Sequence, residues 1–149
     1  MGFGTSATEI IFFVGSVLVA LSISGVLGIT SVHLASGIQD KGNIIKNRFD
    51  TDFAIINNPD NIPVSDGYYV FYIKNTGYNN FYFSSGTVSV IIDGILISPS
   101  NLSFSSADKV SLDRSEVGEI LVNSTLSSGY HTLKVVVYNG IYREIIFQV

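Results

Sequence analysis

The chain lacks cysteine altogether and has few charged residues, which make up 13% of its 149 positions. Without cysteine it can form neither disulfides nor thiolate metal sites. Eight Lys and Arg against twelve Asp and Glu give a net charge of −4, and the bases form no dense cluster. Because nucleic-acid binding depends on a positive surface that neutralises phosphates, we expect no nucleic-acid partner.

The chain also lacks the motifs of common catalytic and nucleotide sites. Neither a P-loop nor a GxGxxG sequence is present. Its two histidines are His33, beside a long apolar segment, and His131, at the start of an expected strand, and we interpret both as surface or capping residues. Two histidines without cysteine provide no ligand-spaced metal cluster. We therefore expect no enzyme activity, no metal and no cofactor.

An acidic stretch near residue 110 is the remaining candidate for a cation site. It lacks the D-x-[DN]-x-[DN]-G pattern of calcium loops, so we interpret it as a solvated edge. Its members are Asp108, Asp113, Glu116 and Glu119.

Residues 10–29, IIFFVGSVLVALSISGVLGI, form an uncharged apolar run. Such a run is long enough to cross the hydrocarbon core of a bilayer, and a buried core helix rarely needs so much unbroken apolarity. No Lys or Arg precedes it, and it is too long for the apolar part of an ordinary secretory signal. We expect a helix from about Thr5 to Ala35 that is either an uncleaved membrane anchor or a fibre-forming helix.

Small residues recur every four positions in this run, at Ser16, Ala20, Ser24 and Gly28. This spacing places them along one helical face, where another helix could approach closely, although small residues are also simply common in spanning helices. Glu9 immediately precedes the run. It either pairs with a neighbour's N-terminal amine in a helix assembly or lies at the membrane interface near the start of its own helix.

After the run, the pattern indicates a stalk and then a domain. Residues 30–49 continue as helix that weakens at Gly37 and Gly42, because each interior glycine costs about 1 kcal/mol relative to alanine. Residues 57–67 contain two prolines with Asn, Asp and Gly and are expected to be a loop. We therefore divide the chain into a hydrophobic helix with its stalk at 1–49 and a domain at 50–149.

The domain reads as a series of short strands. Asp93-Gly94 and Asn139-Gly140 are each flanked by β-branched and aromatic residues, which predicts two hairpins with type I′ turns. The expected strands are 68–74, 87–92, 95–98, 132–138 and 141–149, with weaker candidates at 52–56, 80–83, 102–105, 109–112 and 119–122. With no helical pattern among them, we predict an α+β chain in which a long hydrophobic helix precedes an immunoglobulin-like all-β sandwich.

Sequence signals give opposite predictions for the side of the membrane on which the domain lies. Lys41, Lys46 and Arg48 follow the helix and none precedes it, which by the positive-inside bias favours the cytoplasm. Two sequons for N-glycosylation, at Asn101 and Asn123, and a surface poor in charge instead favour the exterior. We expect a cell-membrane anchor with the β-domain outside the cell and possible glycosylation at both asparagines.

Three stretches resemble the archaellin-like proteins of the archaellum, the archaeal swimming motor. The opening GTSATEIIFFVGSVLVALSISGVLGI is similar to the N-terminal helix of archaellins and of their accessory proteins FlaF and FlaG, which pair that helix with an immunoglobulin-like sandwich. YVFYIKNTG at 69–77 and the hairpin at Asn139-Gly140 are similar to an early strand and the closing hairpin of those domains. The resemblance implies a structural stator that links the motor in the membrane to the surface layer.

One departure separates the members of this family. Archaellins and type IV pilins carry a basic leader ending in Lys/Arg-Gly, whereas residues 1–4, MGFG, hold no basic residue. This favours the unprocessed FlaF and FlaG group, with FlaG preferred. The resemblance implies as partners the membrane, the surface-layer protein, other components of the FlaF/FlaG type and further copies of the chain.

Two other functions stay open. In a filament subunit, the apolar helices would bundle into a fibre core, with Glu9 and the small-residue face as assembly determinants. A membrane-anchored carbohydrate-binding module would instead use loop tyrosines such as Tyr78 and Tyr130. Most aromatic residues, however, lie within expected strands, where they are more simply core and cross-strand pairs.

Overall fold

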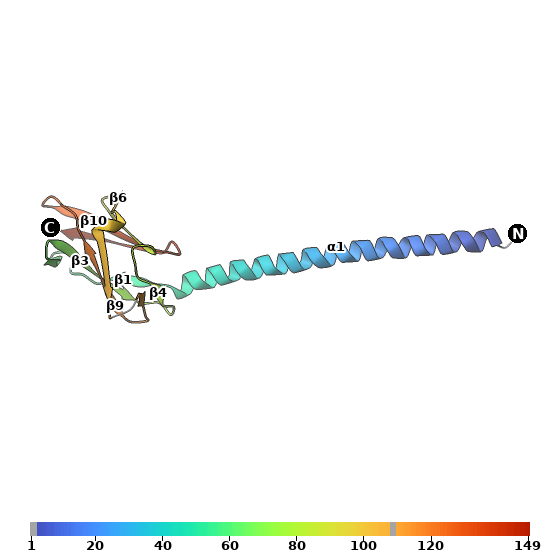
Figure 1. The fold of residues 1–149 in the computed structure, drawn as a ribbon, viewed down its shortest axis with the longest axis horizontal. Helices are drawn as coiled ribbons and strands as arrows, with labels where there is room; N and C mark the ends of the chain where they lie inside the picture. Colours follow the sequence, from blue (N-terminus) through green and yellow to red (C-terminus); the bar gives the residue numbers. More distant parts are fainter. Residues whose placement is uncertain (1–2, 108–109) are drawn as a thin grey trace. The chain divides into compact units, whose positions relative to one another are not determined.

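The structure is a computed structural model that describes residues 3–107 and 110–149. Its internal contacts divide the chain into two compact units, one up to Ile44 and one from Ile45 to Val149. One long apolar helix is followed by packed antiparallel β-sheets (Figure 1), which confirms the predicted fold class.

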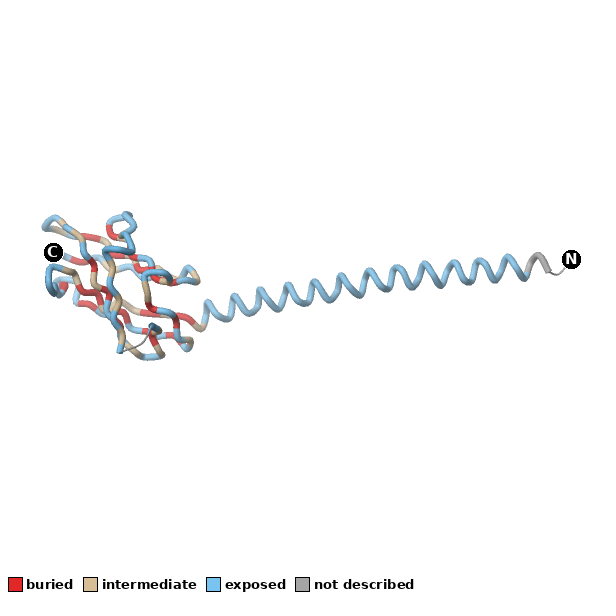
Figure 2. Tube along the Cα trace, in the orientation of Figure 1, coloured by how far each residue is buried: buried red, intermediate tan, exposed pale blue. Residues whose placement is uncertain are grey.

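Helix α1 runs without a break from Phe3 to Asp50, 48 residues in all. At 1.5 Å per residue this corresponds to about 70 Å, more than twice the ~30 Å hydrocarbon thickness of a bilayer. Its side chains are exposed from residue 6 to residue 49, as Figure 2 shows. By length and composition the helix qualifies as a membrane span.

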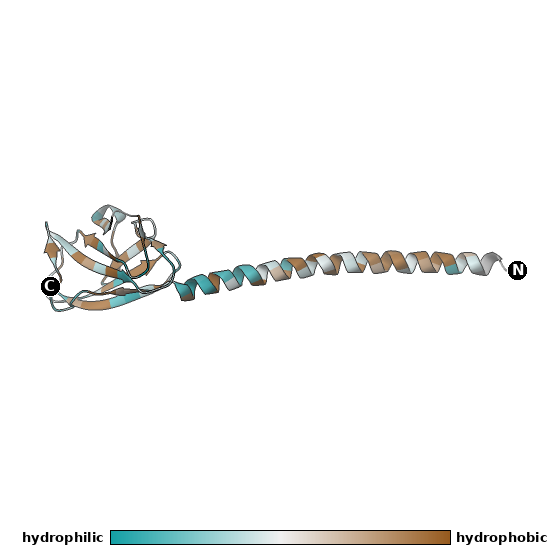
Figure 3. Ribbon diagram, turned by 90° about the horizontal axis from the view of Figure 1, so that it is seen from below, coloured by the Kyte–Doolittle hydropathy of each residue, from teal (hydrophilic) through white to brown (hydrophobic). Residues whose placement is uncertain are grey.

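Hydrophobic residues dominate the N-terminal half of α1 and hydrophilic residues become frequent toward Asp50 (Figure 3). The expected weakening at Gly37 and Gly42 does not interrupt the helix, which includes both glycines. Their flanks contain good helix formers, and a glycine costs helix stability without forbidding the conformation.

The second unit contains two larger sheets and one short strand pair. The first sheet has the order β1–β3–β9–β7, with β2 also paired to β3; its strands are β1 (Phe53–Ile55), β2 (Val64–Ser65), β3 (Tyr68–Asn75), β7 (Leu102–Ser106) and β9 (Val117–Val122). The second has the order β11–β10–β5–β6; its strands are β5 (Val88–Ile92), β6 (Ile95–Leu96), β10 (Tyr130–Val137) and β11 (Tyr142–Gln148). β4 (Phe81–Tyr82) pairs with β8 (Ser111–Leu112), and a 3₁₀ turn, η1, spans Pro99–Asn101.

The core lies between the sheets, because alternate residues of each strand point inward. Along β10, Leu133, Val135 and Val137 are buried while the residues between them are partly exposed. Phe71 on β3 and Phe147 on β11 meet edge-to-face across the two sheets, with ring centroids 5.3 Å apart.

The hairpin turns agree with the sequence prediction at one position and differ at another. Asp93 (φ 52°) and Gly94 (φ 81°) both adopt positive φ, which confirms the type I′ turn between β5 and β6. At the other hairpin only Gly140 (φ 77°) is left-handed, and its N–H donates to the Val137 carbonyl at 2.9 Å. The predicted type I′ turn is wrong there, because Tyr138 enters the loop and gives a longer turn closed by glycine.

A further Asx-Gly turn lies inside the segment that the sequence predicts as loop. Asp66 (φ 50°) and Gly67 (φ 83°) connect the two-residue strand β2 to β3. Because β2 is so short and its residues are exposed, the segment has no hydrophobic alternation by which to recognise the strand.

Phenylalanines and tyrosines take different places in this unit. Five phenylalanines are buried in the core, at positions 53, 71, 81, 83 and 147. Five tyrosines are exposed instead, at positions 78, 82, 130, 138 and 142. The aromatic residues were expected to be core and cross-strand pairs. Those five phenylalanines are core, and Tyr82, Tyr130 and Tyr142 lie in paired strands with their side chains exposed, where the hydroxyl stays in contact with water.

The last turn of α1 is fixed to the sandwich by backbone hydrogen bonds. The Asp50 carbonyl accepts the N–H of Tyr78 at 2.7 Å and of Asn79 at 3.0 Å. The Asp52 carbonyl accepts the N–H of Gly77 at 3.0 Å. A Cβ atom at Gly77 would lie 2.5 Å from the Asp52 nitrogen, so this close approach requires glycine.

Asn75, a buried amide, holds the loop that receives the helix end. Its Nδ2 donates to the carbonyls of Asn79 (2.9 Å) and Leu112 (3.0 Å), and its Oδ1 accepts the Gly77 N–H at 2.9 Å. The sequence marks Asn75-Thr76-Gly77 as a turn but not as this hydrogen-bonded centre, because Leu112 is remote in the chain.

Candidate functional site

The apolar segment of α1 contains hydroxyl side chains whose hydrogen bonds stay within the helix. The Oγ atoms of Ser16, Ser22 and Ser24 donate to the carbonyls three or four residues earlier, each at 2.8 Å. Thr30 does the same with Val26 at 2.8 Å. Because these hydroxyls need no water, they remain compatible with a hydrocarbon environment.

The predicted packing residues lie on the exposed surface of this segment. Ser16, Ala20, Ser24 and Gly28 follow one another at intervals of four, so each lies about 40° further around the helix than the last. Glu9 is also exposed, and the single chain brings none of the five against another described element. Their role in helix packing stays a prediction.

The outer surface of the β11–β10–β5–β6 sheet is rich in apolar and aromatic side chains. Tyr130 (73% exposed), Tyr142, Ile146 (64%) and Leu96 are exposed, and we call these four residues the outer strand face. The paired strands place Tyr142 opposite Val136 and Ile146 opposite Thr132, so these side chains share one side of the sheet.

An ion pair lies on this face. Lys134 Nζ lies 3.0 Å from Glu144 Oε1 and 4.4 Å from the centroid of the Tyr142 ring. The two charges cancel, so the surface around them carries little net charge. Such a surface suits contact with another protein better than binding of a charged small molecule.

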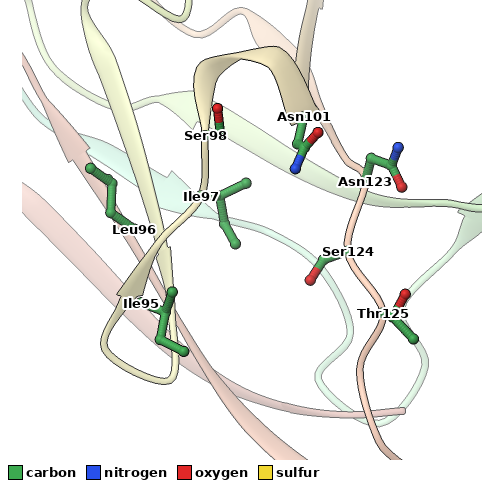
Figure 4. A pocket seen from close by; sticks show the side chains of 8 residues that line it. All are labelled: Ile95, Leu96, Ile97, Ser98, Asn101, Asn123, Ser124 and Thr125. Atoms are coloured by element: carbon green, nitrogen blue, oxygen red, sulfur yellow. The ribbon is translucent and has the colours of Figure 1, made fainter.

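The two sequons meet at one depression of about 500 Å³. Asn101 ends η1 and Asn123 follows β9, and the Asn123 N–H donates to the Asn101 carbonyl at 2.8 Å. Figure 4 shows both side chains at one rim, with Ile95 and Leu96 across from them. Both asparagines are exposed, as attachment of a glycan requires.

The loop tyrosines considered for carbohydrate binding do not lie together in one described pocket. Tyr78 (71% exposed) follows β3, and the Arg114 guanidinium lies 4.5 Å from its ring centroid. Tyr130 begins β10 on the outer strand face.

His131 is a buried side chain, which corrects its interpretation as a surface residue. It is 8% exposed, its Nδ1 lies 2.6 Å from Asp93 Oδ2, and its Nε2 lies 2.8 Å from the Ser127 carbonyl. Both ring nitrogens face acceptors, so the protonated imidazolium satisfies both. The hydrogen bond to Asp93 raises the pKa of His131, and the same bond lowers the pKa of Asp93.

This pair joins the β5–β6 turn to the start of β10. Asp93 Oδ1 also accepts the Thr132 N–H at 2.8 Å. The pair was not predictable from spacing, because 38 residues separate its members. His33, by contrast, is exposed on α1, as predicted.

The acidic stretch is divided by the fold. Glu116 Oε2 accepts the Asp113 N–H at 2.7 Å and so closes the turn before β9. Glu119 is exposed on β9, and Asp108 lies outside the described residues. Within 3–107 and 110–149, no three acidic, histidine or cysteine side chains gather as metal ligands.

Comparison with known proteins gives matches along nearly the whole chain. The profile described as archaeal-type flagellin matches residues 2–147. Flagella-related protein G of Methanocaldococcus jannaschii is 35% identical over 145 residues, 95% of this chain and 93% of that protein. The protein of the same description from Methanococcus voltae is 31% identical over 138 residues, 91% of each.

Two solved structures from Sulfolobus acidocaldarius are also similar. The archaellum periplasmic stator protein FlaG is 24% identical with a TM-score of 0.49, over 65% of this chain and 99% of that one. The periplasmic stator complex of FlaF and FlaG gives 24% identity and a TM-score of 0.45, over 64% of this chain and 87% of that one.

Proposed function

The chain belongs to the archaeal-type flagellin family, and we propose that it is a non-catalytic, membrane-anchored stator component of the archaellum. In this proposal residues 10–29 cross the cell membrane, and the sandwich lies outside the cell, where it contacts the surface layer and components of the FlaF/FlaG type. The similarity to flagella-related protein G over most of both chains supports a structural role in the archaellum.

The observation that carries the proposal is the exposure of the whole apolar run at residues 10–29. The side chains of Ile11, Phe12 and Phe13 are 71%, 75% and 69% exposed. Leaving such side chains in water is unfavourable by about 1.5–3 kcal/mol each, so lipid or other apolar helices must cover them. The internally bonded serines and the lack of charge from residue 10 to residue 29 suit lipid.

The test of anchoring is extraction of cell membranes at alkaline pH, which releases peripheral proteins. We expect the full chain to stay with the lipid, and Leu18→Arg combined with Leu21→Arg to release it, because each central arginine costs about 2.5–3.5 kcal/mol of insertion free energy. Asn43→Arg, beyond the apolar run, is the matched control and should stay anchored. Release of the unchanged chain would sink the anchoring proposal.

The exterior location is tested with single cysteines in this cysteine-free chain. Ser100→Cys and Ser124→Cys, beside the sequon asparagines, should react with a membrane-impermeant maleimide in intact cells. Reaction only after lysis would place the domain in the cytoplasm.

Partner binding is tested separately. The domain from Ile45 onward should bind isolated surface-layer protein or a FlaF-type component. The outer strand face offers the contact surface. Ile146→Lys should therefore weaken binding to the partner, whereas Glu119→Lys, on the other sheet, should leave binding unchanged. Binding to neither partner would count against a stator.

The exposed apolar helix also supports a second candidate, a filament subunit whose helices form a fibre core. Glu9 and the small residues at 16, 20, 24 and 28 would then determine assembly. Electron microscopy of the full chain in detergent-free buffer separates the two, since long fibres favour the filament and short particles favour the anchor.

A further inference from the structure

Apolar residues recur along α1 with a period of 11. Ile23, Leu34 and Ile45 form one series, and Leu27, Ile38 and Phe49 form another, offset by four residues. Eleven residues correspond to about three helical turns, at 3.67 residues per turn, so both series lie along one side of a helix. We call Leu34, Ile38, Ile45 and Phe49 the stalk stripe.

The stalk stripe is exposed to a degree that the fold does not explain. Leu34 and Ile38 are each 65% exposed, and Phe49, at 82%, is more exposed than any other large hydrophobic residue described. On the opposite side Val32 is still apolar, but Gln39, Asn43 and Asn47 follow it there, so the helix is amphipathic from about residue 39 onward.

If residues 10–29 are a membrane anchor, as in the proposed function, lipid does not cover most of the stalk stripe. If residues 10–29 fill the hydrocarbon core, Ile38 lies about 14 Å and Phe49 about 30 Å beyond its edge, at 1.5 Å per residue. The headgroup layer on each side is only about 5–8 Å thick. Protein rather than lipid must therefore cover the outer residues.

We propose that the stalk stripe packs in parallel, and in register, against the stalk stripe of a second copy of this chain. Anchored copies share one orientation and one depth in the membrane, so their stripes meet at equal heights without further guidance. An 11-residue repeat is the pattern of a right-handed supercoil of helices. The stripe continues the apolar run, so one helix contact extends from the membrane into the stalk.

The margins of the stripe fit a two-fold pair. Lys41 borders it on one side, three residues after Ile38, and Ser31 and Gly42 border it on the other. In a parallel two-fold pair each helix sets one margin against the opposite margin of its partner. The stem of Lys41 therefore lies over Gly42 of the second copy, which is at the same height, with room for its bulk and with the two lysines kept apart.

The absence of cysteine makes this contact measurable by disulfide cross-linking of the full chain in membranes. Leu34→Cys and Ile38→Cys place a thiol on the stripe. Val32→Cys and Asn43→Cys place it on the opposite side, and Val32 is a close match for Leu34 in depth and exposure, at 67% against 65%. We expect covalent dimers at positions 34 and 38, at least about fivefold faster than at 32 and 43, the ratio that 1 kcal/mol of preference gives.

A second variant tests the outer end of the stripe. Phe49→Glu in the Ile38→Cys chain should slow dimer formation about fivefold or more, because it removes an apolar contact and sets two carboxylates together. Asn43→Glu is the control and should leave the rate unchanged.

Alkaline extraction of the same membranes separates failure of this inference from failure of the proposed function. Released protein refutes the anchor itself. Retained protein that cross-links equally at all four positions, or at none, refutes the stripe contact. An adduct whose mass differs from two chains shows that another protein covers the stripe and equally overturns the pairing of copies.

Discussion

At the scale of single residues, the least expected arrangement is the ion pair between His131 and Asp93. Both ring nitrogens of the buried imidazole face acceptors, at 2.6 Å and 2.8 Å, and the pair connects a turn to a strand of the same sheet. Its pKa shifts have opposite signs, so the pair stabilises the fold over a limited pH range.

The expected pH dependence follows from those signs. The raised pKa of His131 gives stabilisation that is complete below its ordinary pKa of about 6.5 and is lost as pH rises through the raised value. The lowered pKa of Asp93 gives stabilisation that is present above about 3.9 and is lost in stronger acid. Thermal unfolding in detergent should therefore show a fall in Tm above pH 6.5 that His131→Gln abolishes. The control variant His33→Gln, on the exposed helix, should keep the fall in Tm. An equal fall in Tm in the His131→Gln chain would contradict a stabilising role for the His131–Asp93 pair.

Gly77 is a second residue with a specific steric requirement. Alanine there would place Cβ 2.5 Å from the Asp52 nitrogen and 2.6 Å from the Asp50 oxygen, both in the backbone at the end of α1. We expect Gly77→Ala to lower the free energy of unfolding by about 1–3 kcal/mol or more, as in overpacked cores. Urea denaturation measures this, and Gly86→Ala, whose nearest neighbour would be 3.9 Å away, should differ little from the unchanged chain.

The sequon asparagines give a prediction that needs no partner. If the domain lies outside a glycosylating cell, intact mass spectrometry should show an added glycan that Asn101→Gln and Asn123→Gln each reduce. Unmodified mass in chain purified from such cells would contradict this prediction. Ile95 (70% exposed) and Leu96 (62%) lie across the same depression, so a glycan there would also shield apolar surface.

At the scale of elements, α1 shows that a long helix can tolerate glycines without ending. Its helical hydrogen bonding passes through Gly37 and Gly42 to Asp50. The stalk is therefore less stable than its length alone implies, since each interior glycine costs about 1 kcal/mol relative to alanine.

Gly37→Ala should recover about 1 kcal/mol of that stability, because nothing lies within 4 Å of a Cβ atom there. Hydrogen exchange of the stalk amides in detergent should slow about fivefold in this variant while the sandwich amides stay unchanged. Equal exchange rates in the unchanged chain and the Gly37→Ala variant would show that opening of the stalk helix does not depend on Gly37.

The strands show which parts of the fold sequence patterns can predict. β5, β10 and β11 have β-branched runs beside Asx-Gly pairs, and the prediction located all three. β2 lacks both length and burial, and the sequence does not reveal it. The turn at Gly140 was predicted at the right place with the wrong geometry, because loop length there depends on how β10 and β11 pair.

At the scale of the whole molecule, residues 50–52 connect the end of α1 to the sandwich through several contacts. Thr51 is 2% exposed, the Asp52 carboxylate pairs with Arg143, and the Asp50 carbonyl accepts two hydrogen bonds from the 77–79 loop. The last turn of α1 therefore contributes to the stability of the sandwich.

Two truncated chains test this contribution. A chain starting at Ile45 should unfold cooperatively and without detergent, whereas one starting at Phe53 should lose about 2–4 kcal/mol, at roughly 1 kcal/mol for each hydrogen bond or ion pair removed. Denaturant unfolding of both gives the difference. Equal free energies of unfolding for the two truncated chains would mean that residues 45–52 do not stabilise the domain.

Sequence reasoning predicted the long helix and the sandwich because both depend on local periodicity. The contacts that hold the helix end, such as Asn75 with Leu112, join residues 37 positions apart and were not predictable. The convergence of Asn101 and Asn123 likewise depends on the pairing of β7 with β9. Candidate residues could be named from the sequence, but their grouping came only from the topology.

The closing hairpin also determines when the domain can fold. Leu133, Val135, Val137 and Phe147 all line the core, and all belong to β10 and β11, the last strands to be synthesised. Helix α1 leaves the ribosome about 80 residues before this hairpin, so in the proposed anchor it is available for membrane insertion while the domain is still unfolded. If the domain lies outside the cell, as proposed, this order of elements lets the chain cross the membrane before the core of the domain closes.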